Sequence, residues 1–170
     1  MNKAGRTIRM TLAAPVCIAA VVFCTGKTVY AEGISYINAA GETQPSVETY
    51  TQVRSTTTEW TNGWYVADGN VTISDRITVK GTDVNLILCD NAVLSAESGI
   101  FVRRVNAETV YKLTISAQST DHAGSLIAVG GRNAGIGGGV NAGIDYEGGN
   151  IVINGGSITA SGKPGIDASG

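Results

Sequence analysis

The sequence contains little cysteine and histidine, and it has no convincing helical hydrophobic period. Three of its 170 residues are cysteine and one is histidine. Two of the cysteines lie in a segment that has the features of a signal peptide, so Cys89 alone would remain and no intrachain disulfide could form. His122 has no partner at the spacing of a zinc site or of a nucleophile with a histidine base, which argues against both. Packing and backbone hydrogen bonds must therefore stabilise the fold.

Cys89 ends an apolar run at residues 86–89. This position predicts a buried, unreactive thiol. A reactive or cross-linking thiol is the alternative.

The amino terminus has the pattern of a secretory signal peptide. Three basic residues precede an uncharged, largely apolar run over residues 10–24, and the segment ends in Val29-Tyr30-Ala31. The run is shorter than the roughly 20 residues that a membrane-spanning helix needs. Residues 1–31 are therefore predicted to be a signal peptide cleaved after Ala31, and an uncleaved anchor is the alternative. A secreted or cell-surface location follows, with membrane contact only through export.

Removal of this segment makes the chain acidic. The whole sequence has 12 Lys and Arg and 14 Asp and Glu, and four of the basic residues lie in residues 1–31. The rest carries 8 basic and 14 acidic residues, a net charge of −6. Nucleic acid and anionic membrane surfaces are disfavoured as partners. Residues 137–142 fit the pattern G-x-G-x-x-A, but no helix is expected after them, so no nucleotide site is predicted.

Residues 32–58 differ in composition from the remainder. Thr, Ser, Glu and Gln dominate, Pro45 interrupts, and apolar residues are sparse and aperiodic. A flexible leader is predicted here.

Residues 59–170 repeat a phrase of two alternating apolar runs separated by a polar turn. The copies are residues 70–73 with 77–79, 85–88 with 93–96, 112–115 with 126–129, and 150–153 with 158–160. Because a short strand pair cannot bury its apolar face alone, the copies must stack as an all-β solenoid. The residues expected to point inward are Val71, Ile73, Ile77, Val79, Leu86, Leu88, Leu94, Ala96, Ile100, Val102, Leu113, Ile115, Leu126, Ala128, Ile151, Ile153, Ile158 and Ala160.

Glycine is concentrated late in the chain, with 15 of 23 between Gly124 and Gly170. Glycine suits the corners of stacked strands, where the backbone turns sharply. The pattern continues to the last residue, which predicts an incomplete domain with an open carboxyl-terminal end and further domains downstream. The alternative is that a partner covers the last layer.

An aromatic segment precedes the first phrase. Trp60, Trp64 and Val66 have one parity and could share a strand face, whereas Asn62-Gly63 is also a turn sequence that could fold the segment into a hairpin. Two roles are open for Trp60, Trp64 and Tyr65. They could cover the first layer of the solenoid, or they could form a platform on which a sugar stacks.

Acidic residues late in the chain are candidate metal ligands, and Asp75, Asp83 and Asp90 form an alternative set of carboxylates. Asp145 and Glu147 would share a strand face, and Asp167 could lie beside Asp145 on an adjacent layer. Carboxylate oxygens bind Ca²⁺, so these residues are candidate ligands for structural calcium. No other cofactor and no catalytic residue is predicted. A polysaccharide lyase would need Lys or Arg near such carboxylates, and after Arg132 the only basic residue is Lys163.

The combination of several phrases resembles the glycine-rich β-helix region of large surface proteins from gut Firmicutes such as clostridia, and more broadly carbohydrate-binding parallel β-helix proteins. The phrases are Asn62-Gly63-Trp64-Tyr65-Val66, Leu113-Thr114-Ile115-Ser116-Ala117, Ala134-Gly135-Ile136-Gly137-Gly138-Gly139 and Gly149-Asn150-Ile151-Val152-Ile153-Asn154-Gly155-Gly156. The resemblance implies a bacterial right-handed parallel β-helix and adhesion to glycans, and it supplies no catalytic motif.

Three functions follow as hypotheses. The first is an exported, non-enzymatic binding module that adheres to a polysaccharide or host glycan. The second is a purely structural stalk that displays downstream domains. The third is a fragment of a pectate-lyase-like enzyme that degrades polysaccharide.

Overall fold

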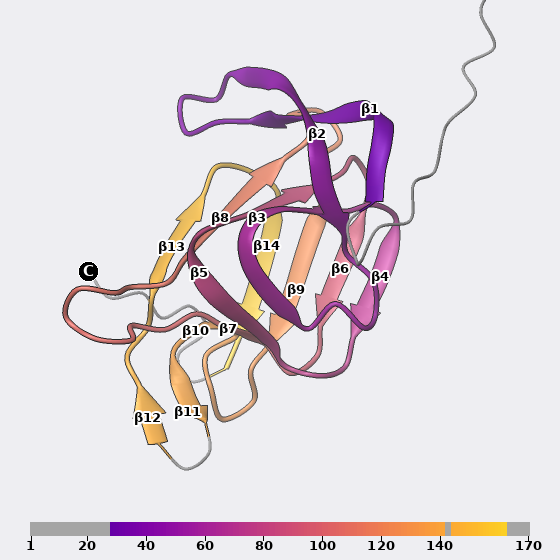
Figure 1. Cartoon of the computed structure of the whole chain (residues 1–170). Helices are drawn as coiled ribbons and strands as arrows, with labels where there is room; N and C mark the ends of the chain where they lie inside the picture. The colour runs from indigo at the N-terminus through magenta and orange to yellow at the C-terminus, as the bar shows by residue number, and fades with distance from the viewer. Residues whose placement is uncertain (1–27, 142–143, 163–170) are drawn as a thin grey trace, which may run out of the picture.

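The computed structural model describes residues 28–141 and 144–162, and this part of the chain is all-β, with strands and no helix (Figure 1). It contains no helix of the length and apolarity that crossing a membrane requires. The first seven strands are β1 (Thr28–Ile37), β2 (Thr43–Gln52), β3 (Glu59–Ala67), β4 (Asn70–Ile73), β5 (Ile77–Leu88), β6 (Val93–Ala96) and β7 (Ile100–Phe101). The others are β8 (Lys112–Ala117), β9 (Ser125–Val129), β10 (Ile136–Gly137), β11 (Gly139–Asn141), β12 (Ile144–Tyr146), β13 (Asn150–Ile153) and β14 (Ser157–Ser161).

The larger sheet has eight strands and is mostly parallel. Its order is β1-β2-β3-β5-β7-β10, and β8 and β13 continue separately from β5. The long strand β5 pairs with β7 through residues 77–78 and with β8 through residues 84–88. Beyond β5 the sheet therefore continues as two parallel strips, β7 with β10 and β8 with β13.

The second sheet is fully parallel and has the order β4-β6-β9-β14. Its strands align without register shifts, so that Val71, Leu94, Leu126 and Ile158 follow one another across the sheet. Side chains of this sheet and of the two strips of the larger sheet form one continuous hydrophobic core. The described residues form strands and no helix, which confirms the prediction of an all-β fold.

The core confirms most of the predicted inward positions. Fully buried members include Ile73, Ile77, Val79, Leu86, Leu94, Ile100, Leu113, Ile115 and Leu126. Ile153 is an exception, because its side chain is 43 % exposed although its register partner Ile115 is fully buried. Ile153 lies on β13, which in the described part of the chain pairs on one edge only, with β8.

The first repeated phrase is aligned differently from the prediction. Residues 70–73 form β4, which pairs with β6 and so corresponds to the second run of the next phrase. The strand beside residues 85–88 is β3, which contains the aromatic segment. The aromatic residues thus belong to the first strand of the stack and do not precede it.

Residues 32–58 are not the flexible leader that their composition predicts. Strands β1 and β2 pair antiparallel, and the end of β2 pairs in parallel with β3. The hairpin packs a few apolar side chains against the outer face of the larger sheet, in a second cluster that includes Ile34, Tyr36, Val47, Tyr50 and Trp64. Register shifts in β1 break the alternation, which explains why no strand pattern was visible in the sequence.

Strand β1 begins at Thr28, upstream of the predicted cleavage point after Ala31. The remainder of the predicted signal peptide, residues 1–27, lies outside the described residues.

Candidate functional site

A pocket of about 220 Å³ lies between β2 and β3, at the aromatic segment. It combines aromatic rings with uncharged polar groups. Its lining residues are Thr49, Tyr50, Thr51, Thr61, Asn62, Gly63, Trp64 and Tyr65. None of them is Asp, Glu, Lys, Arg or His.

A corner in β3 shapes this pocket. Thr61 pairs with Lys80 and Gly63 pairs with Val84, so Asn62 alone lies opposite three residues of β5. Here the Asn62 side chain replaces a backbone acceptor between the two strands, because its Oδ1 accepts a hydrogen bond from the Asp83 N–H at 3.1 Å. Gly81 makes this approach feasible, since a Cβ there would lie 2.2 Å from Asn62 Oδ1. The corner therefore fixes Asn62 at the edge of the pocket.

The corner also reverses which residues of β3 point inward. Trp60 and Tyr65 pack in the main core, whereas Trp64 and Val66 belong to the outer cluster under the β1–β2 hairpin. The expectation that Trp60 and Trp64 share a strand face was therefore wrong. The extra residues of β5 at the corner shift the register and change the parity of β3. The hairpin suggested by Asn62-Gly63 is also absent, since β3 runs from Glu59 to Ala67.

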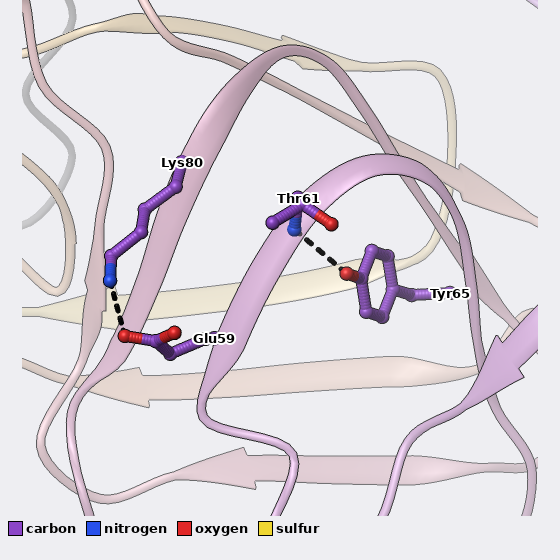
Figure 2. Close-up of polar contacts among 4 residues, drawn as sticks. All are labelled: Glu59, Thr61, Tyr65 and Lys80. Atoms are coloured by element: carbon purple, nitrogen blue, oxygen red, sulfur yellow. Dashed lines mark hydrogen bonds and ion pairs between the residues drawn. The ribbon is translucent and has the colours of Figure 1, made fainter. Parts of the chain in front are cut away.

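Trp60 cannot serve as a sugar platform in this structure. Its side chain is fully buried, it stacks on Tyr65 with ring centroids 5.1 Å apart, and its Nε1–H donates to the Thr57 carbonyl at 3.0 Å. Tyr65 is also buried, but its hydroxyl reaches the pocket lining, where it accepts a hydrogen bond from the Thr61 N–H at 2.8 Å (Figure 2). The stacked pair is therefore part of the main core, at the first strand of the stack.

Trp64 is the aromatic residue that remains available to a ligand. Its side chain is partly exposed and lines the pocket. The Tyr36 ring packs against it, with centroids 4.6 Å apart and planes tilted by 48°. This contact supports the indole from one side at the pocket.

Two of the predicted calcium ligands, Asp145 and Glu147, line one depression, but no third ligand joins them within the described residues. Asp145 is an exposed residue of β12, and Glu147 pairs with the Arg104 Nε at 3.3 Å. Strand β12 forms an antiparallel hairpin with β11, so Asp145 is not in a stacked layer as expected. Asp167 lies outside the described residues. Within residues 28–141 and 144–162 no group of three or more His, Cys, Asp or Glu is placed to hold a metal ion.

A second, more open depression of about 370 Å³ lies beside the β11–β12 hairpin. Its lining includes both carboxylates and the arginine just described, with Val105, Asn106, Ala107 and Tyr146. Since Arg104 already pairs with Glu147, the depression offers neither an unpaired cation nor a cation site with three carboxylates.

Cys89 and His122 have no role at either pocket. Burial, with the negative charges of Asp68 and Asp90, raises the pKa of the Cys89 thiol to about 12. This supports the prediction of a buried, unreactive thiol. His122 is exposed in the loop between β8 and β9.

Sequence reasoning found Trp64 and Tyr65 but missed the other half of the pocket. Thr49, Tyr50 and Thr51 lie in the segment that composition assigned to a leader, and Asn62 was interpreted only as a turn residue. The Asn-Gly pair was the one visible sign of a corner. Comparisons with protein-family models, curated proteins and solved structures found no match to this chain.

Proposed function

We propose that this chain is an exported glycan-binding module built on a right-handed parallel β-helix, and that it acts in secreted form or at the cell surface. Three strips of parallel strands support the β-helix: the two strips of the larger sheet and the four-stranded sheet. Each strip contributes side chains to one shared core. The basic and apolar amino terminus supports export.

The β2–β3 pocket carries the functional proposal. Sugar-binding sites need an aromatic ring for the apolar face of a pyranose, and polar groups that hydrogen bond its hydroxyls. Trp64 supplies the ring, and Asn62 with the surrounding threonines supplies the polar groups. The corner of β3 and the Tyr36 contact hold these side chains in place, which lowers the entropy cost of binding.

An array of neutral and acidic glycans, probed with the whole exported chain, tests the proposal. We expect binding to at least one glycan class, and we expect Trp64→Ala to weaken it about tenfold or more, since the stacking surface is lost. Tyr111→Ala is the control, because it removes a partly exposed ring outside the pocket and should leave binding unchanged. If the unmodified chain bound no glycan, a structural stalk would be the better account.

A further inference from the structure

We propose that the β2–β3 pocket selects uncharged sugar residues, and that the Asn62 side-chain amide donates the hydrogen bond that orients them. This inference rests on the proposed glycan-binding function and names the class of ligand for the same pocket. It follows from the charges around the pocket, from the bonding of Asn62 and from the position of Trp64.

The charges near the pocket disfavour an acidic ligand. No lining residue carries a positive charge. Lys80 lies on the neighbouring strand, but Figure 2 shows its amino group directed at Glu59, with which it forms an ion pair. The backbone N–H of Asp83 donates to Asn62, so the acidic residue Asp83, which brings a negative charge, is a direct neighbour of the pocket lining. The carboxylate of a bound uronic acid would find no basic side chain in the pocket lining to pair with. Burial of an unpaired charge is unfavourable.

The bonding of Asn62 leaves a donor for the ligand. Its Oδ1 already accepts the Asp83 N–H, which sets the amide so that Nδ2 is on the other side. Within the described residues Nδ2 has no hydrogen-bond partner, and the side chain is exposed at the pocket. The Nδ2 hydrogens can therefore bond to a sugar hydroxyl oxygen. Close packing against Gly81 prevents the amide from withdrawing.

The positions of Trp64 and Asn62 in β3 suit a single sugar ring. They are two residues apart, on either side of Gly63, and both line the same 220 Å³ pocket. A pyranose stacked on the indole would thus present its edge hydroxyls to Asn62 and to the threonine hydroxyls. Recognition would combine one apolar contact with several neutral hydrogen bonds.

A pair of matched ligands tests the inference on the unmodified chain. Oligogalactosides and oligogalacturonides of the same length and linkage differ only in a hydroxymethyl group against a carboxylate. Calorimetric titration of the whole chain should show that the neutral oligomer binds at least about tenfold more tightly. A second neutral series, oligoglucosides, is titrated in the same way to detect a preference for glucose over galactose.

Two variants test the role of Asn62. Asn62→Asp keeps the oxygen that accepts the Asp83 N–H and removes the amide donor, so affinity for the neutral oligomer should fall about tenfold. Asn150→Asp is the control, since it adds the same charge at an exposed position of β13, outside the pocket. Thermal melting of both variants checks that the fold is retained.

The outcomes separate the two proposals. Preference for neutral oligomers with a loss in Asn62→Asp supports the inference. Tighter binding of the oligogalacturonide, with a loss in Trp64→Ala, would overturn it and leave the glycan-binding function standing. The inference would also be overturned if neutral oligomers bound and neither Asn62→Asp nor Trp64→Ala weakened that binding. Absence of binding to every glycan on the array would refute the glycan-binding function itself.

Discussion

At the scale of single residues, Trp60 and Trp64 occupy different environments although they are four positions apart. Trp60 is fully buried and hydrogen bonded, whereas Trp64 is partly exposed at the pocket. We predict that Trp60→Ala lowers the free energy of unfolding by about 3–5 kcal/mol, because it leaves a large cavity in the core. Trp64→Ala should lower it by only about 1–2 kcal/mol. Urea unfolding measures both, and equal losses would contradict the assignment.

Cys89 gives a prediction about pH. The pKa of its thiol is about 12 in the folded chain and has an ordinary value near 9 in the unfolded chain. Between pH 9 and 12 the thiol is therefore protonated in the folded chain and ionised in the unfolded chain. The contribution to stability is therefore complete below pH 9 and is lost as pH rises from 9 through 12.

At pH 8, site-resolved mass spectrometry should find Cys89 unlabelled by iodoacetamide in the folded chain and labelled in urea. In alkaline unfolding experiments, Cys89→Ala should lose less stability between pH 9 and 12 than the unmodified chain. Rapid labelling of the folded chain would show that the thiol is accessible and ionised.

At the scale of elements, Arg76 is one of three arginines that contact the β11–β12 hairpin, beside Arg103 at the Tyr146 ring and Arg104 at Glu147. The Arg76 guanidinium donates to the carbonyls of Val140 at 3.0 Å and Gly138 at 3.4 Å, and it lies 4.2 Å from the centroid of the Phe101 ring. Tyr146 of β12 contacts the same ring edge-on. Burial lowers the pKa of Arg76.

Arg76→Ala should loosen this hairpin without unfolding the chain, because the contacts of Arg103 and Arg104 remain. Loss of two hydrogen bonds and a cation–π contact corresponds to about 1–3 kcal/mol of local stability. Hydrogen exchange should therefore accelerate in β11 and β12 by about tenfold or more, while exchange in β5 stays unchanged. Arg132→Ala, at an exposed arginine, is the control. Equal exchange in the hairpin of both variants would contradict this role.

Gly63 gives a second prediction for an element, because it lies at the corner of β3. Its φ of +132° is unfavourable for residues with a side chain, although no atom lies within 4 Å of a Cβ there. Gly63→Ala should thus cost about 1–2 kcal/mol of stability and also weaken glycan binding, since the corner places Asn62 and Trp64. Gly69→Ala, at another open position with positive φ, should cost stability alone. Unchanged glycan binding in Gly63→Ala would argue against the corner as the organiser of the pocket.

At the scale of the whole molecule, stability should decrease along the stack of strands. Strands β5, β6, β8 and β9 have neighbours on both sides, whereas within the described residues β13 and β14 each pair on one edge. Ile151 and Ile158 on these last strands are only partly buried. Because stacked strands are stabilised mainly by their nearest neighbours, native hydrogen exchange should be slowest in β5 and β8 and faster in β13 and β14. Uniform protection would indicate a single cooperative unit.

The sequence predicted the core well because a strand with one buried face leaves a simple alternation. The eighteen inward positions were chosen on that basis, and Ile153 is the one that proved exposed. Alternation could not predict the corner at Asn62, because a register shift changes parity without changing composition. Nor could it predict the β1–β2 hairpin, which buries few apolar residues. The pocket combines both features, so only its Trp64 and Tyr65 were found.

The most direct test of the account is a titration of the whole chain with neutral oligosaccharides, followed in two-dimensional ¹H–¹⁵N NMR spectra. We predict that the largest shifts occur at the Trp64 indole N–H, at the Asn62 side-chain amide and at backbone amides of β2 and β3. Signals from the four-stranded sheet should not move. Shifts confined to that sheet or to the β11–β12 hairpin, or no shifts at millimolar ligand, would contradict the assignment of the β2–β3 pocket as a sugar-binding site.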